Sequence, residues 1–562
     1  MSSSPKHVGA ARQKLGSLAF RFAPFGVVAL ALLAQIPIYD RSIIHVDEGQ
    51  LVAIAARLLR GEVLYRDVYT GIFPGLYYST AALFSLFGSD VRVTRLAQVA
   101  VNAGTALCLW LLGRRVMSAA WAALAPLLYA VLVVVGFPGL TMFNYSPLSL
   151  VLALFALLFL LRQLEAPRRA DGIAAGLLLA GCALTKQNFG ALTLLAFLIV
   201  ILLRWRDGAL AGRGLPRTLW PVAAAGGLAS AAALVALISA GAGPALLDAS
   251  LFALGRTQIE SYADPFPAIL GPHPSDDGRF VFLYTPAALY GYLVRGETLF
   301  GRPIPVWLWS GAIRVAYGGA LLALAGGGLR LWLDRRADPP RRRRETRALV
   351  VFAGVLFLGI FPSAIWSHLA FVLAPLLLIA AWVLEGVHAW LCTRSAATAR
   401  VFGIGVAVFA AAGTLAAARI SFDVARWYPV PLSLPRASLH VSNDQAALYR
   451  GALRFVERCA PPRAPIFVAP DMPLIYFLAD RPNPTPFDLV IPGKVDGSLI
   501  VERLEATATR CVVYGPRIYL QFAPFEELFP QVAELLRTRY REVVRIQGGS
   551  VEWLGLVRRD AS

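Results

Sequence analysis

Two adjacent carboxylates, Asp47 and Glu48, are the residues best placed to do chemistry in this sequence. They follow an apolar run that can span a membrane and that ends near Tyr39. They also open residues 47–60, whose pattern predicts a short amphipathic helix, and the start of a helix favours negative charge. An aspartate there can take a proton from an attacking hydroxyl group within hydrogen-bond reach. The pair can equally be a solvated helix cap, and composition alone does not decide between these roles.

A second polar group interrupts apolar sequence at Thr185, Lys186, Gln187 and Asn188. A lysine near a membrane edge often only extends its ammonium group to the lipid headgroups. With three other polar residues beside it, a site for an anionic headgroup is the better interpretation. Lysine is a compact charge that suits phosphate, so Lys186 and Gln187 are predicted to bind substrate.

Three further polar residues, Arg95, Asn144 and His368, are predicted on the same side of the membrane as Asp47. Arg95 can bind phosphate through two parallel hydrogen bonds, whereas its neighbour Arg92 is better explained as an interfacial anchor. Asn144 can hold a sugar or a metal, or it can cap the helix that follows it. His368, in a predicted tight turn between two spans, can contact substrate or serve a structural role.

Metal and disulfide chemistry stay open in the sequence. His273, Asp276 and Asp277 supply nitrogen and oxygen donors, but their spacing matches no known ligand pattern. No cofactor is therefore assigned, and a divalent cation remains an alternative. Cys459 and Cys511 each precede a predicted strand, so they can form a disulfide if those strands are neighbours, or stay as buried thiols.

The composition indicates a membrane protein. Of the 562 residues 57% are hydrophobic and only 15% are charged, whereas soluble domains are about 25% charged. A membrane helix needs about 20 mostly apolar residues. On that basis eleven spans are predicted, over residues 22–39, 93–112, 118–136, 147–162, 172–185, 189–204, 218–240, 306–333, 348–364, 368–390 and 401–420.

The positive charge predicts the orientation. With the N-terminus in the cytoplasm, every loop assigned to the inside is basic, including the run Arg341–Arg344, as the positive-inside rule requires. The net charge of +19 is thus explained without nucleic acid, since no basic patch is interleaved with aromatic residues. The acids gather in two long outer loops, 40–92 and 241–305. In the first, Gly75–Gly88 is too short for a span and predicts an interfacial or re-entrant helix.

Three regions follow from this topology. Residues 1–21 are a cytoplasmic N-terminus, residues 22–420 a transmembrane module, and residues 421–562 an extracytoplasmic domain. From Ser438 onward helical and strand patterns alternate, which favours a small α/β domain. That domain carries no phosphate-binding glycine loop and no nucleophile elbow.

The motifs of the first outer loop resemble the GT-C superfamily of polytopic glycosyltransferases. The resemblance is greatest to the branch with protein O-mannosyltransferases, the aminoarabinose transferases of lipid A and bacterial galacturonosyl transferases. It covers residues 20–210 well and the C-terminal domain only in general plan. The matching segments are Val46-Asp47-Glu48-Gly49, Leu59-Arg60-Gly61, Leu64-Tyr65-Arg66-Asp67, Phe73-Pro74-Gly75-Leu76-Tyr77-Tyr78, Arg95-Leu96 and Leu184-Thr185-Lys186.

The resemblance implies a GT-C fold in a bacterial plasma membrane and a polyprenyl-phosphate-linked sugar as donor. It implies transfer to an envelope lipid, glycan or protein on the outer face, by an inverting single displacement. Asp47 would be the base, with Glu48 beside it in the catalytic pair, and Lys186 and Arg95 would meet the phosphate.

The sequence also departs from the aminoarabinose branch. That branch has a Glu-Lys pair ahead of the prolines where this chain has Thr70 and Gly71, and an Asp where it has Asn144. A lipid A substrate and a second catalytic acid are therefore not implied. A transporter or flippase of lipid-linked sugars is the main alternative, although transporters usually show internal repeats that are not found here. A non-catalytic scaffold with a sugar-binding outer domain is a third.

Overall fold

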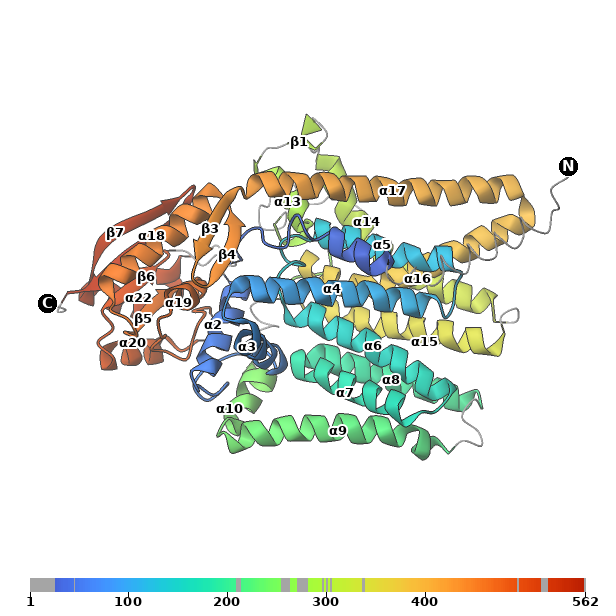
Figure 1. Cartoon of the computed structure of the whole chain (residues 1–562), viewed down its shortest axis with the longest axis horizontal. Coiled ribbons are helices and arrows are strands. Elements are labelled where there is room, and N and C mark those ends of the chain that lie inside the picture. The colour runs from blue at the N-terminus through green and yellow to red at the C-terminus, as the bar shows by residue number, and fades with distance from the viewer. Residues whose placement is uncertain are drawn as a thin grey trace, which may run out of the picture.

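The protein is a bundle of long helices with a smaller mixed domain at one end (Figure 1). The computed structural model describes residues 26–44, 46–208, 214–253, 263–269, 282–295, 298–299, 302–303, 306–335, 339–492, 495–516 and 524–559. The candidate metal ligands His273, Asp276 and Asp277 lie outside the described residues, as does His45.

Among the described residues, ten long helices build the bundle. They are α4 (Val91–Gly113), α5 (Ala119–Val135), α6 (Tyr145–Glu165), α7 (Arg169–Thr185), α8 (Gln187–Arg206), α9 (Leu215–Ser239), α14 (Val306–Leu333), α15 (Pro340–Phe357), α16 (Trp366–Arg394) and α17 (Ala396–Trp427). Within the described part of the chain, seven helices are long and apolar enough to cross a membrane. Each predicted span from residue 93 onward falls on one of the ten, which confirms the polytopic helical class.

Three of the predicted boundaries are wrong. In the first span, predicted over 22–39, the described residues begin at 26; they are helical to residue 33 and form turns from there to residue 40. Pro37 lies in these turns, and proline cannot donate the hydrogen bond that a continuing helix needs. α15 ends at Phe357 rather than 364. It begins at Pro340, so the Arg341–Arg344 run belongs to a helix and not to a loop.

The bundle end opposite the C-terminal domain has the character of a membrane boundary. Four tryptophans that are more than half exposed, Trp205, Trp220, Trp332 and Trp390, lie at helix ends there. Tryptophan prefers the level of the lipid headgroups because its ring is apolar and its N–H is polar. Figure 1 shows the long helices running between this end and the domain end of the molecule.

Short elements connect the long helices on the domain side. They are α2 (Asp47–Leu59), α3 (Gly75–Phe87), α10 (Gly243–Leu247), the π-helical η1 (Asp248–Ala253), α13 (Ala287–Arg295), β1 (Thr298–Leu299), β2 (Arg302–Pro303) and the 3-10 segment η2 (Leu358–Ile360). α2 and α3 confirm the two predicted helices of the first outer loop.

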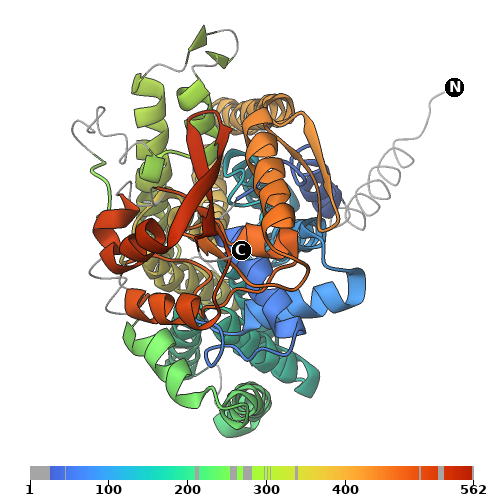
Figure 2. The same ribbon diagram turned by 90° about the vertical axis from the view of Figure 1, so that its left-hand side faces the viewer.

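The C-terminal domain is the predicted small α/β unit, and it faces the viewer in Figure 2. Its elements are β3 (Val430–Leu434), β4 (Ala437–Val441), α18 (Asn443–Cys459), β5 (Ile466–Ala469), α19 (Leu474–Ala479), α20 (Gly497–Ala506), β6 (Cys511–Tyr514), α21 (Phe525–Leu528), α22 (Pro530–Arg539), β7 (Tyr540–Gly548) and β8 (Val551–Arg558). The main sheet has the order β5-β6-β8-β7. β5 and β6 are parallel, and β8 is antiparallel to both of its neighbours.

One feature of this domain differs from expectation, and a second concerns the two cysteines, for which a disulfide and buried thiols were both left open. The β3–β4 hairpin, which follows α17 directly, has no counterpart among the predicted strands. Cys459 and Cys511 are free thiols even though β5 and β6 are neighbours. Cys459 is the last residue of α18 rather than the residue before a strand, so strand pairing alone does not join the two cysteines.

α2 and α3 are packed into the core of the C-terminal domain. Their buried apolar residues form one cluster with those of α18, α19 and the sheet. Phe84 of α3 stacks on Phe477 of α19, with ring centroids 5.4 Å apart. At Gly49 a Cβ atom would lie 2.7 Å from the backbone nitrogen of Leu474, so only glycine lets α2 approach α19 this closely.

Candidate active site

Asp47 is the first residue of α2, and its side chain is exposed. Glu48, its neighbour, points the other way and is fully buried. Asp47 lies close enough to Tyr77 of α3 and Tyr145 of α6 to interact electrostatically with both hydroxyl groups. Burial raises the pKa of Tyr77, and the charge of Asp47 raises it further. The carboxylate is therefore accessible and next to two tyrosines.

Glu48 forms a buried ion pair with Arg95. The Arg95 Nη2 donates to Glu48 Oε2 at 2.7 Å, and the Nε donates to Oε1. Both side chains are essentially inaccessible. Arg95 also donates to the backbone oxygen of Ser42 at 3.2 Å, and its Nη1 meets Thr141 at 3.5 Å. This bidentate pair fixes α2 to the membrane helix α4.

This geometry gives no support to the predicted phosphate role of Arg95. Its guanidinium donors are directed at Glu48 and at backbone and hydroxyl oxygens, and it is 0% exposed. Glu48 is likewise occupied by Arg95 and by the backbone N–H of Ile44. Both residues hold the start of α2 in place, and neither reaches the exposed face on which Asp47 lies.

Lys186 is the single residue between α7 and α8. Its ammonium donates to the Ser146 hydroxyl at 2.8 Å and lies 4.5 Å from the ring centre of Phe189 and 5.1 Å from that of Tyr145. No carboxylate among the described residues pairs with it, and it is 9% exposed. Burial lowers the pKa of this lysine to about 7. A buried cation without a counter-ion is costly, so this position is suited to an anionic ligand.

A close backbone contact sets Lys186 beside the first outer loop. A Cβ atom at Gly75, the first residue of α3, would lie 2.8 Å from the Leu184 carbonyl oxygen. Only glycine allows α3 to meet the end of α7 this closely. The Tyr145 ring lies 5.1 Å from the Lys186 ammonium, and the charge of Asp47 acts on the same tyrosine.

Gln187 links two outer segments. Its Nε2 donates to the Gly71 carbonyl at 2.8 Å and to the Ser250 carbonyl at 3.2 Å, which fixes the orientation of the amide. Its Oε1 is buried and has no hydrogen-bond partner among the described residues. An amide oxygen can only accept a hydrogen bond, so the Oε1 of Gln187, a residue predicted to bind substrate, suits a hydroxyl group rather than an ionised phosphate oxygen.

Asn144 and His368 have structural contacts. The Asn144 Oδ1 accepts from the Ser146 backbone N–H at 3.0 Å, which is the helix-capping alternative for α6. His368 lies in the first turn of α16 rather than in a free turn, and its Nδ1 is 2.6 Å from the Ser363 carbonyl. His368 also interacts electrostatically with Lys186. Asn144 thus positions Ser146, the partner of Lys186, and His368 lies at the edge of the site.

The sequence interpretation assigned no individual role to Tyr77, Thr70 or Arg57. The Tyr77 hydroxyl is hydrogen-bonded to the Thr70 hydroxyl at 2.8 Å beneath the Asp47 face. Arg57, a basic residue within the helical stretch 47–60, is 4% exposed and bonded to the C-terminal domain. The signal in the sequence that could have found Arg57 was its place as a basic residue in an otherwise apolar face of the predicted helix. Within the described residues, no group of three or more His, Cys, Asp or Glu side chains is arranged to hold a metal.

Comparisons with known proteins agree with this architecture. Residues 73–215, which include α3 and Lys186, match the family model of dolichyl-phosphate-mannose-protein mannosyltransferases. No curated protein matches the sequence.

Solved structures match over most of the chain. The structure of ArnT from Cupriavidus metallidurans bound to undecaprenyl phosphate has 15% identity and a TM-score of 0.58, covering 95% of this chain and 98% of that one. The Archaeoglobus fulgidus oligosaccharyltransferase tethered with an acceptor peptide has 11% identity and a TM-score of 0.54, covering 97% and 75%. The chain therefore has the fold of these multi-pass membrane proteins, and its residues 73–215 are similar to the mannosyltransferase family.

Proposed function

We propose that the protein transfers a sugar from a polyprenyl-phosphate-linked donor to a hydroxyl group of an envelope lipid, glycan or protein. The observation that carries this proposal is that an exposed carboxylate, Asp47, and a buried ammonium, Lys186, which has no carboxylate partner among the described residues, both interact with Tyr145. The match to a family that uses a dolichyl-phosphate sugar, and the undecaprenyl phosphate bound by a protein of the same fold, support a lipid-phosphate donor.

Each residue has one task in the proposed reaction. The acceptor hydroxyl attacks the anomeric carbon while Asp47 takes its proton, and the bond from that carbon to the phosphate oxygen breaks. A single displacement of this kind inverts the anomeric centre. The leaving lipid phosphate gains negative charge, which the Lys186 ammonium stabilises in a site of low dielectric. The Gln187 Oε1 is available to accept a hydrogen bond from a sugar hydroxyl.

The Glu48–Arg95 pair acts indirectly in this scheme. It holds the first turn of α2 against α4, so that the Asp47 carboxylate keeps its place relative to Tyr77 and Tyr145. We therefore assign Glu48 and Arg95 as positioning residues rather than as a catalytic acid and a phosphate ligand.

The proposed site lies at the domain end of the bundle, which we place on the outer face of a bacterial plasma membrane. The N-terminus is then cytoplasmic, as the arginine distribution predicts. A lipid-linked donor also accounts for a site built where membrane helices meet outer loops.

Asp47→Asn is the test of this proposal. Purified enzyme in detergent or nanodiscs would be given a polyprenyl-phosphate sugar together with an envelope extract, and sugar transfer would be followed by mass spectrometry. Loss of the base is expected to lower kcat by about 10²–10⁴-fold, while Asp90→Asn, which alters an exposed cap of α4, serves as the matched control. Transfer at the wild-type rate by Asp47→Asn would remove the proposed base. Movement of lipid-linked sugar across a bilayer without a new glycosidic bond would establish the flippase alternative instead.

A further inference from the structure

Arg57 joins α2 to the C-terminal domain through a buried hydrogen-bond centre. Its Nη1 donates to Asp488 Oδ1 and to the Thr485 carbonyl, both at 3.0 Å. Its Nε donates to Glu62 at 2.7 Å, and its Nη2 donates to the Asp67 carbonyl at 3.0 Å. One guanidinium therefore ties together α2, the first outer loop and the C-terminal domain.

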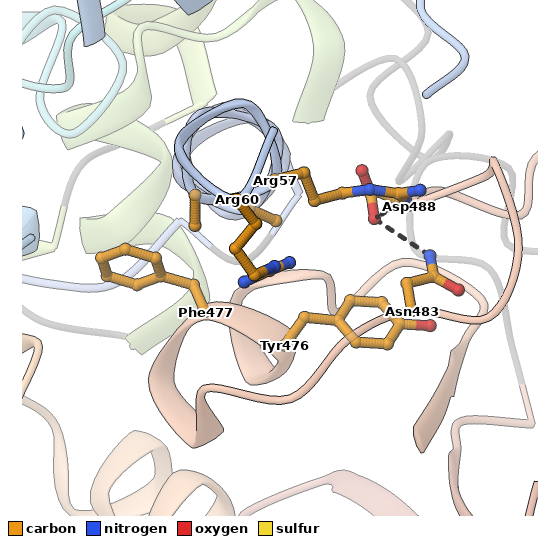
Figure 3. A pocket seen from close by; sticks show the side chains of 8 residues that line it. Arg57, Arg60, Tyr476, Phe477, Asn483 and Asp488 are labelled. Carbon is orange, nitrogen blue, oxygen red and sulfur yellow. Dashed lines mark hydrogen bonds and ion pairs between the residues drawn. The ribbon is translucent and has the colours of Figure 1, made fainter. Parts of the chain in front are cut away.

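Figure 3 shows Arg57 extending from α2 to Asp488, whose carboxylate is also hydrogen-bonded by Asn483. Asp488 is 1% exposed, and its second oxygen, Oδ2, has no hydrogen-bond partner among the described residues. The carboxylate is thus held there by Arg57 and Asn483 at the cost of burying a charge. Such a pair is weak support for stability as such, which points to a role in fixing geometry.

The segment 483–488 touches a second element of the site. The Pro486 carbonyl accepts from the Tyr69 backbone N–H at 2.8 Å, and the rings of Tyr69 and Phe487 meet edge to face with centroids 5.6 Å apart. The next residue in the chain, Thr70, holds the Tyr77 hydroxyl. Gly71, which follows Thr70, supplies the carbonyl oxygen that accepts a hydrogen bond from Gln187.

α2 is consequently held at both ends by different parts of the molecule. Near its start, Glu48 binds Arg95 of the membrane module. Nine residues later, about 13 Å along the helix axis at about 1.5 Å per residue, Arg57 binds the C-terminal domain. Asp47 lies on the exposed face of α2, whose direction both contacts set.

We propose that segment 483–488 of the C-terminal domain, acting through the Asp488–Arg57 pair, is a positioning element for Asp47. This inference rests on the proposed function of Asp47 as the base. It makes the C-terminal domain a structural part of the site, in addition to any part it has in contacting the acceptor. Asp488 and Arg57 are positioning residues, since neither faces the reacting atoms.

The test measures kcat and the KM for the donor in Asp488→Asn and Arg57→Lys, normalised to folded enzyme by size-exclusion chromatography. Asp488→Asn keeps the side-chain volume but removes the charge. The control is Glu534→Gln, which breaks an exposed ion pair of the same chemistry with Arg537 on α22. We expect kcat to fall about 10–10²-fold, as for a small displacement of a catalytic group, with the KM for the donor within about twofold because Lys186 is untouched.

A double variant separates positioning from general damage. If Asp488 acts through Asp47, Asp488→Asn causes no further loss when Asp47 is already Asn. Losses that multiply in the double variant, or an unchanged kcat in both single variants, would overturn the inference. Wild-type activity of Asp47→Asn alone would instead overturn the proposed function. If Asp488→Asn does not accumulate as folded protein, Arg57→Lys in both backgrounds decides in the same way.

Discussion

Arg95 and Lys186 are two buried cations near the same end of the bundle, and their surroundings differ in one respect. Arg95 has a carboxylate partner, Glu48, with two parallel hydrogen bonds. Lys186 has a hydroxyl, Ser146, and two aromatic rings. The first arrangement is electrically complete, whereas the described residues supply no carboxylate for the second. On the proposed function, the difference separates a residue that builds the site from one that binds an anion.

The contrast also explains why residue type alone misleads. Arginine is better suited than lysine to bidentate phosphate binding, and the sequence places both on one side of the membrane. The glutamate beside the proposed base pairs with the arginine, and we therefore propose the lysine as the phosphate ligand. Only the three-dimensional pairing of residues 47 positions apart in the chain reveals this.

The largest expected effect is on stability at Arg95. Arg95→Met leaves the Glu48 carboxylate buried without its partner, which should cost about 3–5 kcal/mol. Thermal unfolding in detergent should show a clearly lowered Tm. The double variant Glu48→Gln/Arg95→Met removes both charges and should recover much of the loss. If Arg95→Met unfolds like the wild type but loses donor binding, Arg95 is a ligand for the phosphate after all.

Lys186→Met should lower activity without lowering stability, whereas Arg95→Met should mainly lower stability. Removing a buried charge without a carboxylate partner should leave the Tm unchanged or raise it. Loss of the cation at the phosphate should lower kcat/KM about 10²–10³-fold, the size seen when one preorganised donor is removed from a developing anion. Lys186→Arg is the matched control that keeps the charge. A Tm lowered as far as that of Arg95→Met, with activity retained in the folded fraction, would make Lys186 a structural residue.

A smaller effect is expected on the pH dependence of donor binding. Burial lowers the pKa of Lys186, which lies in the turn between two helices, to about 7. The ammonium is charged only below that pKa, so donor affinity should fall about tenfold for each pH unit above about 7. Isothermal titration with polyprenyl phosphate from pH 6 to 9 measures this. Lys186→Arg should flatten the profile because arginine stays charged, and an equally steep profile in that variant would assign the titration to another group.

The lowered pKa of Lys186 also determines whether the free energy of unfolding rises or falls with pH. An unfolded lysine keeps its proton to about pH 10 while the buried one loses it near 7, so between these values the unfolded state binds more protons. The free energy of unfolding of the ligand-free protein should therefore rise with pH over that window. Lys186→Met should lack this contribution.

The order of the membrane helices was predictable because each span is a long apolar run, and its length can be read directly from the local sequence. The predicted helix at residues 47–60 and the turn at Lys186 were found for the same reason. The helix ends near Pro37 and at Phe357 were missed because in both places the apolar sequence continues beyond the helix, as it does from Leu358 to Phe361, so hydropathy alone does not mark the boundary. Long-range pairings were not predictable: Arg57 with Asp488, 431 positions away, and Glu48 with Arg95 leave no local pattern.

The structure also explains individual residues in the segments that resemble the GT-C superfamily and in those that depart from it. Gly49 and Gly75 are required where α2 meets α19 and where α3 meets the end of α7. Asn144 caps α6, which accounts for an amide at that position without a catalytic role. These are contacts between elements, so a single sequence shows the residue types without their reasons.

The most direct test of the account is equilibrium binding of polyprenyl phosphate to the full-length protein in nanodiscs, compared between Lys186→Met, Asp47→Asn and the wild type. The account predicts that Lys186→Met loses affinity at least about tenfold, equivalent to about 1.4 kcal/mol, while Asp47→Asn binds like the wild type. Equal affinity of Lys186→Met and the wild type would contradict the assignment of the carboxylate-free cation as the phosphate site.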